Sequence, residues 1–134
     1  MGSNINMEAI NVPEYAGREC SISISDQIKL IKNDVPAADA GKLEKFADLF
    51  TSLVVGLGLP TPYIYPSKPG NVRAEWSGVD WEVTLDVNLQ ASTASALAVG
   101  IHESSSFTLV SLSHPASVNA FGVFMRTRGI TTRV

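Results

Sequence analysis

The chain has 134 residues, of which 45% are hydrophobic and 17% are charged, and it carries a net charge of −3. This composition is that of a folded globular protein and excludes disordered, collagen-like and coiled-coil chains, each of which requires a strong compositional bias. The acidic balance disfavours general nucleic-acid binding, and the single cysteine excludes an intrachain disulfide.

The N-terminal residues give no sign of a targeting or membrane segment. Residues 1–30 lack the basic start and continuous apolar stretch of a secretory signal. The longest apolar run, residues 53–59, is far shorter than the about 20 residues that span a bilayer. We therefore expect no membrane association and a cytoplasmic location. Residues 1–19 have no sustained periodicity and are predicted to form a mobile arm, followed by one α+β domain over residues 20–134.

The first element after the arm has two interpretations. Alternating serines and apolar residues over 20–25 indicate either a short strand or the lead into a helix. Ser25 or Asp26 could cap a short helix that ends before Pro36. The apolar residues of this helix would be Ile28, Leu30 and Ile31.

A longer helix is predicted over about residues 38–56, with Asp39 as its N-cap. Its apolar residues recur at steps of three and four and form one stripe, Leu43, Phe46, Phe50, Leu53 and Leu57. Gly56 and Gly58 provide the flexible backbone at which helices end, and Pro60 prevents continuation. A single apolar stripe requires a second layer to cover it.

Strands are predicted next. Residues 60–62 are extended by two prolines and lead into a strand at 63–65, which a Pro/Gly turn ends. Two runs with a period of two then flank residues 77–80, which predicts an antiparallel hairpin with one apolar and one polar face. We expect Trp76 and Trp81 on the apolar face to pack on Phe46 and Phe50. The other apolar positions of the hairpin are Val72, Ala74, Val83, Leu85 and Val87.

A second hairpin is predicted from residues 97–102, through a turn at 103–106, into 107–112. Residues 115–128 fit either a helix, with Pro115 near its start and Gly129 at its end, or a strand through Phe121, Val123 and Met125. The predicted fold is α+β: an antiparallel meander of four to five strands packed on one long helix, with a second, C-terminal helix if residues 115–128 are helical.

The polar face of the first hairpin holds candidate acid/base residues. If Trp76 pairs with Trp81, Glu75 lies opposite Glu82 and Arg73 faces Thr84. Carboxylates directly opposite one another are within about 5.5 Å, and such pairs serve in acid/base or metal-assisted catalysis. The simpler interpretation, which we favour, is a solvated face on which Arg73 offsets the repulsion.

His102 and Glu103, with the serines that follow them, are the other candidate catalytic residues, because a nucleophilic serine requires a base and an orienting acid. No nucleophile elbow surrounds these serines, and serines are ordinary turn residues. The one cysteine and two histidines match no metal-binding spacing, and no phosphate-binding glycine loop is present. We therefore expect no cofactor and no metal.

Candidate binding residues lie in two places. Tyr63 and Tyr65 share one face of their strand and either line a groove or, more commonly, cover the rim of a core with their hydroxyls in water. Arg73 on the next strand is a further candidate binding residue. After Glu103 the only charged residues are Arg126, Arg128 and Arg133. These arginines form either a solvated tail, which we favour, or a contact for phosphate or an acidic partner.

The stretch from Leu59 to Pro66, followed by Gly70 and by Val72-Arg73-Ala74-Glu75-Trp76, resembles a pattern in small, uncharacterised bacterial proteins. In that pattern a helix precedes Leu-Pro-x-Pro, a Pro/Gly turn and a strand that ends in Glu-Trp. The resemblance covers about residues 38–88 and implies a bacterial origin and a helix followed by a hairpin. Residues 32–36 depart from the Gly-Trp-Asp-Gly-like segment of that group, and the resemblance transfers no catalytic residue.

Taken together, the sequence favours a non-catalytic interaction or regulatory protein that binds another protein or itself. The strands expected at 98–102 and 107–112 contain no Asp, Glu, Lys or Arg. If such uncharged strands are exposed edges of a sheet, they pair readily with other chains. A small hydrolase-like or metal-assisted enzyme using Glu75 and Glu82, or His102 and Glu103, is the rival hypothesis. Nucleic-acid contact through the C-terminal arginines is the third hypothesis.

Overall fold

Five antiparallel strands form one sheet in the order β1-β2-β3-β4-β5, so that each strand pairs with its neighbour in the sequence. The computed structural model describes residues 19–132. The arm expected over residues 1–19 therefore lies, apart from Glu19, outside the described residues. The strands are β1 Tyr63–Pro66, β2 Asn71–Ser77, β3 Trp81–Asn88, β4 Thr93–Gly100 and β5 Ser104–Leu109.

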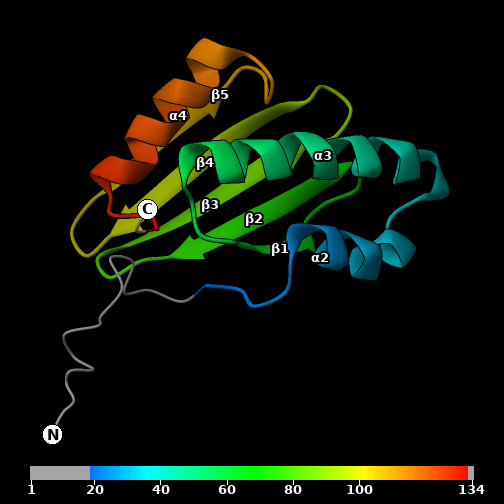
Figure 1. Ribbon diagram of the computed structural model, residues 1–134, viewed down its shortest axis with the longest axis horizontal. Coiled ribbons are helices and arrows are strands. Elements are labelled where there is room, and N and C mark those ends of the chain that lie inside the picture. Colours follow the sequence, from blue (N-terminus) through cyan, green and yellow to red (C-terminus); the bar gives the residue numbers. More distant parts are fainter. Residues whose placement is uncertain (1–18, 133–134) are drawn as a thin grey trace, which may run out of the picture.

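Helices cover one face of this sheet (Figure 1). The helices are α2 Ile24–Ile31, α3 Ala40–Leu57 and α4 Pro115–Thr127, and two 3-10 turns, η1 Lys32–Asp34 and η2 Ala37–Asp39, connect α2 to α3. α3 and α4 lie across the sheet, and α2 lies beside β1. The predicted α+β class, an antiparallel meander packed on a long helix, is confirmed. In the described part of the chain no helix is both long and apolar enough to cross a membrane.

The C-terminal segment is a helix, and its interpretation as a strand is wrong. Pro115 occupies the first helical turn, where its missing N–H has no intrahelical role. Phe121 and Met125 are both completely buried against the sheet. Residues four apart share one face of a helix, whereas Val123, which the strand would have aligned with them, is 55% exposed.

The ends of α2 and α3 follow local chemistry, with two corrections. α2 begins after Ser23, whose hydroxyl accepts the Asp26 N–H at 3.1 Å, so the cap is neither Ser25 nor Asp26 and residues 20–25 do not form a strand. Asp39 is the N-cap residue of α3, as predicted, but its side chain makes no cap hydrogen bond, because η2 already winds the chain into the helix. Gly58 ends α3 in the left-handed conformation, at φ 67°, whereas Gly56, the other glycine predicted to end the helix, lies inside it.

The first hairpin has the predicted faces but a different register. Trp76 pairs with Val83, so Arg73 lies opposite Asp86 and Glu75 lies opposite Thr84. The predicted pairing of Trp76 with Trp81 is wrong. The Gly78 N–H donates to the Trp81 carbonyl at 2.8 Å, so Gly78 pairs with Trp81 and the hairpin loop consists of residues 79–80. A shift of two residues keeps every side chain on its face but changes its cross-strand partner.

The second hairpin also turns earlier than predicted. The Gly100 N–H donates to the Glu103 carbonyl at 2.8 Å and closes a loop of residues 101–102. Ser104 to Ser106 are therefore part of β5, and the predicted turn at residues 103–106 is wrong. Gly100 lies against Trp81, and a Cβ there would lie 3.3 Å from the indole ring.

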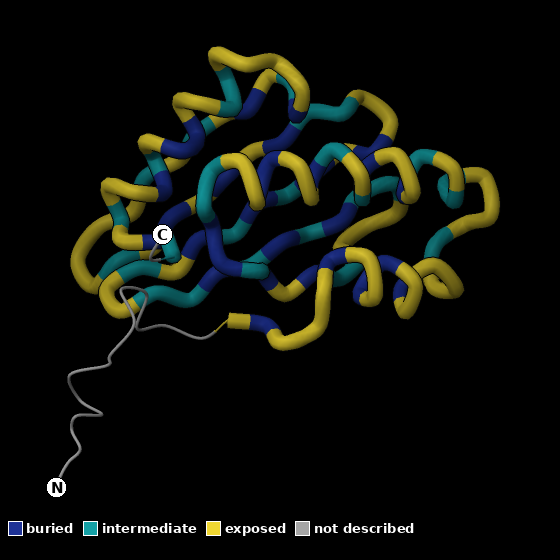
Figure 2. Tube along the Cα trace, in the orientation of Figure 1, coloured by how far each residue is buried: buried dark blue, intermediate teal, exposed yellow. Residues whose placement is uncertain are grey.

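The hydrophobic core lies between the sheet and the helices, where buried residues alternate with less buried ones along the strands (Figure 2). Trp76 is 1% exposed and lies between Phe50 and Phe121, with ring centroids 6.1 and 6.2 Å away. The Trp76 indole N–H donates to the Pro60 carbonyl at 2.8 Å, which satisfies its polar atom. Trp81 is on the same face but only partly buried, because it lies at the end of the sheet, where Arg128 covers it.

Candidate functional site

The outer edge of β1 is closed by a side chain. Gln27 of α2 is 6% exposed and lies alongside β1. Its carbonyl oxygen accepts the Ile64 N–H at 2.7 Å, and its amide nitrogen donates to the Pro62 carbonyl at 2.9 Å and the Ile22 carbonyl at 3.0 Å. One amide group thus takes the place that the backbone of a neighbouring strand would occupy.

The residues around Gln27 complete this closure. The Cys20 N–H donates to the Thr61 carbonyl at 3.1 Å, and Glu19 accepts the Thr61 N–H at 3.2 Å. Pro62 and Pro66 have no N–H to offer to another strand. The β1 edge therefore has few unpaired backbone groups with which a further strand could pair.

The opposite edge, β5, has a different character. β5 pairs with β4 on one side, and within residues 19–132 no strand lies on its other side. Its six residues, Ser-Ser-Ser-Phe-Thr-Leu, include no charge and no proline, which are the devices that commonly protect an edge. Two strands were expected to be exposed edges. The prediction is wrong for the strand at 98–102, because residues 98–100 are the end of β4, which lies between β3 and β5, whereas β5 is an edge of the sheet.

The direction of the free backbone groups of β5 follows from the hairpin loop. Gly100 and Glu103 form the hydrogen-bonded pair that closes it. Since hydrogen-bonded and non-hydrogen-bonded pairs alternate along an antiparallel ladder, Ser104, Ser106 and Thr108 direct their N–H and C=O groups away from β4. β5 therefore presents alternating donors and acceptors along about 20 Å.

α4 lies over β5 and extends this edge into the helix layer. The rings of Phe107 on β5 and Phe124 on α4 have centroids 5.4 Å apart, and both side chains are only partly buried. Arg128, just after α4, donates to the Ser105 hydroxyl at 2.6 Å and to the Phe124 carbonyl at 2.8 Å. Its guanidinium lies 3.8 Å from the Phe124 ring centroid, a cation–π contact that fixes α4 on the sheet.

The sheet face that turns away from the helices carries several of the predicted binding residues. Tyr63 pairs with Glu75, and Tyr65 pairs with Arg73, so the three binding residues predicted on strands do share this face. An Arg73 nitrogen lies 3.9 Å from an Asp86 oxygen, and the Arg73 Nε is buried without a hydrogen-bond partner among the described residues. A solvated face with paired charges is ordinary for an antiparallel sheet.

The candidate acid/base residues are not brought together as predicted. Glu82 lies opposite Ser77 and not opposite Glu75. The two glutamates are therefore diagonal neighbours, and their Cα atoms are about 7–8 Å apart. His102 and Glu103 are exposed at the β4–β5 loop. Across residues 19–132, no three His, Cys, Asp or Glu side chains are grouped so that they could hold a metal ion.

The C-terminal arginines are separated by the structure. Arg126 is exposed on α4, while Arg128 is partly buried and engaged with aromatic rings and Ser105. Arg133 lies outside the described residues. A joint phosphate contact by Arg126 and Arg128 would require Arg128 to leave these partners.

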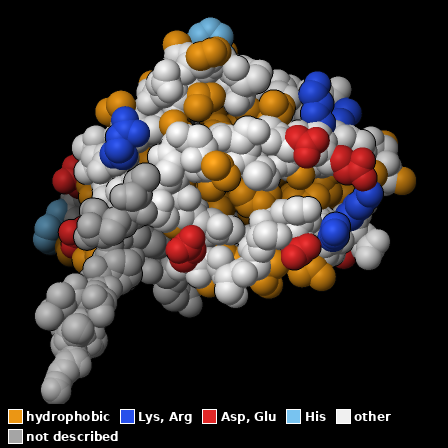
Figure 3. Space-filling model, in the orientation of Figure 1, with side chains coloured by type: hydrophobic (Ala, Val, Ile, Leu, Met, Phe, Trp, Pro, Cys, Tyr) orange, Lys and Arg blue, Asp and Glu red, His pale blue; other side chains and the backbone are white. Residues whose placement is uncertain are grey.

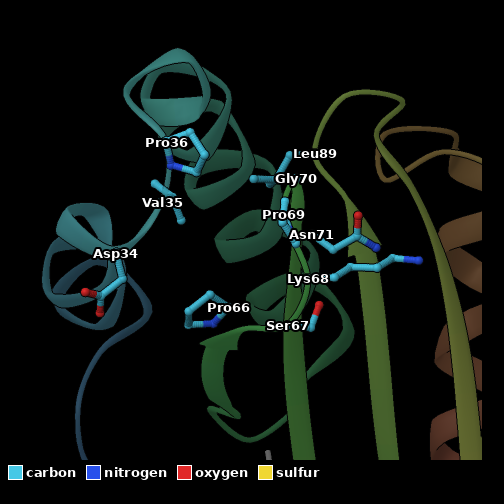
Figure 4. A pocket seen from close by; sticks show the side chains of 10 residues that line it. All are labelled: Asp34, Val35, Pro36, Pro66, Ser67, Lys68, Pro69, Gly70, Asn71 and Leu89. Atoms are coloured by element: carbon cyan, nitrogen blue, oxygen red, sulfur yellow. The ribbon is translucent and has the colours of Figure 1, made fainter.

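A shallow cavity of about 440 Å³ lies between the segment that joins α2 to α3 and the β1–β2 turn (Figure 4). Asp34, Val35 and Pro36 form one wall, and the turn from Pro66 to Asn71 forms the other. Half of its lining residues are proline, valine or leucine, and the polar ones are Asp34, Ser67, Lys68 and Asn71; it includes none of the predicted site residues.

Gln27 and the pair Phe107 and Phe124 are the features that the sequence interpretation did not identify. For Gln27 a signal was present: it occupies an apolar position in the stripe Ile24, Gln27, Ile28 and Ile31, where a polar side chain must find buried partners. Neither protein-family models, nor curated proteins, nor solved structures give a match to this chain.

Proposed function

We propose that this chain is a non-catalytic interaction protein that binds a protein partner by strand addition at β5. The observation that carries the proposal is the unequal treatment of the two sheet edges. The β1 edge is closed by the Gln27 amide and two prolines, whereas β5 is uncharged and no strand within residues 19–132 pairs with its outward backbone groups.

Strand addition fits the chemistry of β5. Backbone hydrogen bonds supply affinity in this binding mode, and pockets for alternate side chains supply specificity. The partly exposed rings of Phe107 and Phe124 lie beside the edge and offer aromatic contact area of the kind enriched at interfaces. The proposal includes a cytoplasmic location, which the lack of a possible intrachain disulfide supports.

The test compares two substitutions at one position. Ser106→Pro removes the outward N–H of the edge without removing a bond to β4, and Ser106→Ala keeps that N–H while removing the same hydroxyl. The tagged chain is used to capture proteins from the organism that encodes it, and captured proteins are identified, purified and titrated against each variant. We expect Ser106→Pro to weaken binding by about tenfold or more and Ser106→Ala to leave it within about twofold.

Circular dichroism of each variant controls for folding, and Ser106→Lys replaces the proline variant if that one fails to fold. A partner that binds all variants equally would contradict the proposal, as would a chain that associates with neither another protein nor itself.

A further inference from the structure

We propose that the partner of β5 is a second copy of this chain, which pairs β5 with β5 in antiparallel fashion about a twofold axis perpendicular to the sheet. This inference rests on the proposed function and names its partner. It joins two five-stranded sheets into one continuous sheet, with the helices of both copies on the same face.

The residue composition of β5 in the sheet, and of α4 in the helix layer above it, points to a second copy. Gly122 lies against Leu57 of α3, with a Cβ position 2.8 Å from that side chain, whereas Phe124 lies against Phe107 of β5. Helical spacing places on the Phe124 flank a row of small or apolar residues, Ala116, Ala120, Phe124 and Thr127. This uncharged helix row adjoins the uncharged strand through the contact of Phe124 with Phe107.

A lone added strand would cover only the lower of these two layers. Stable interfaces bury about 800 Å² on each partner, and the α4 row would remain exposed beside an isolated peptide strand. A second copy related by the twofold axis brings its own α4 to the same height, so strand meets strand and helix meets helix. The small side chains Ala116 and Ala120 are exposed and allow the two helices to approach.

The distribution of charge agrees with a self-complementary contact. On the helical face, charged side chains gather over α2 and the beginning of α3, whereas most of the surface over α4 is uncharged (Figure 3). In a twofold contact any charge at the centre would meet its own copy. Arg128 binds Ser105 near one end of β5, so antiparallel pairing places the two Arg128 side chains at opposite ends of the joined strands.

The twofold arrangement makes a specific prediction for Ser106. Ser106 is near the middle of β5, and its side chain is exposed. In antiparallel pairing of β5 with itself, Ser106 lies close to Ser106 of the other copy. Lysine at this position would meet lysine, and glutamate would meet glutamate, but the two variants would complement each other.

Sedimentation velocity of the full chain over a concentration series tests this arrangement. We expect the unmodified protein to dimerise, Ser106→Lys and Ser106→Glu each to weaken the dimer by about tenfold, and an equimolar mixture of the two to recover dimer. Ser95→Lys is the matched control, because Ser95 is exposed on the same face but lies in β4. This control should dimerise as the unmodified chain does. Ala120→Glu should weaken the dimer by a similar factor through the helix layer.

A protein that stays monomeric at about 200 μM, well above the Kd of a stable dimer, would overturn the inference. So would a dimer that survives both Ser106 variants, or charged variants that the mixture fails to rescue. If the protein is monomeric but captures a different partner, and the Ser106 substitutions weaken that binding, the proposed dimer is refuted and strand addition at β5 is supported. A monomer without any edge-dependent partner would overturn both.

Discussion

Gln27 shows how one side chain can decide which edge of a sheet is open. A glutamine amide has one acceptor and one donor group on the same plane, as a peptide unit has, so it can satisfy both an N–H and a C=O of an adjacent strand. Its position in the apolar stripe of α2 places it at β1, and α2 therefore replaces a sixth strand. The polarity of one residue thus closes the β1 edge and leaves β5 as the other edge of the sheet within residues 19–132.

Gln27→Ala is expected to lower the free energy of unfolding by about 2 kcal/mol. The substitution leaves the Ile64 N–H and the Pro62 carbonyl buried without their partner, and unmet buried groups carry the full cost of desolvation. Gln90→Ala is the matched control, because Gln90 is exposed in the β3–β4 turn. Urea unfolding should show a change below about 0.5 kcal/mol for the control. Equal effects of the two substitutions would refute the structural role of Gln27.

Arg128 illustrates the opposite case, in which a residue expected to bind a partner is used internally. Its guanidinium lies 5.0 Å from the Trp81 ring centroid and 3.8 Å from that of Phe124. The same side chain bonds Ser105, so it connects the end of α4 with β3 and β5. A cation among aromatic rings is stabilised by their quadrupoles, and this explains why Trp81 needs no helix stripe to cover it.

At the scale of elements, two glycines at the C-terminal end of α3 have opposite roles. Gly56 lies inside the helix, where a Cβ would meet no atom within 4 Å. Gly58 follows the helix at φ 67°, a conformation that residues with a Cβ adopt only with strain. Its carbonyl also accepts the Thr132 N–H at 2.9 Å, so this turn holds the end of the described chain.

The two positions should therefore respond to the same substitution with opposite signs. Gly56→Ala is expected to raise the free energy of unfolding by about 1 kcal/mol, because alanine favours the helix over glycine. Gly58→Ala is expected to lower it by about 1 kcal/mol, because the left-handed backbone must then carry a Cβ. Thermal unfolding followed by circular dichroism measures both. A stabilising Gly58→Ala would show that the helix does not end in this conformation.

At the scale of the whole molecule, an ion pair ties the N-terminal helical segment to α3. Lys32 of η1 donates to the Glu44 carboxylate. The hydrogen bond from Lys32, and then its charge, hold the pKa of Glu44 below its ordinary value. A carboxyl whose pKa is lower in the folded state adds stability above its unfolded pKa, and this contribution is lost as the pH falls through the folded pKa.

Lys32→Met should therefore return the pKa of Glu44 towards its ordinary value, as NMR titration of the carboxyl carbon would show. The free energies of unfolding of the variant and the unmodified chain should also become equal in acid, where Glu44 is protonated in both proteins. Because both side chains are exposed, salt should shrink the effect. Lys68→Met, in the β1–β2 turn, is the control and should leave the Glu44 titration unchanged.

The sequence alone determined the elements that depend on local periodicity. The apolar stripe of α3, the glycine that ends it and the alternating faces of β2 and β3 were predicted from spacing, because burial against one layer imposes a period of about 3.6 on a helix and of 2 on a strand. These periods were sufficient for the α+β class and for the position of Trp76 in the core. The resemblance to small bacterial proteins stays a prediction.

Only the tertiary structure decided which residues meet. A shift of two residues in the first hairpin preserves the alternation, so the sequence pattern could not distinguish Glu75 opposite Glu82 from Glu75 opposite Thr84. The sheet order likewise decided that β5 and not β4 is an edge, and the packing of α2 decided that β1 is closed. Register and edges depend on pairing between distant segments, whereas periodicity records only that each segment has a buried side.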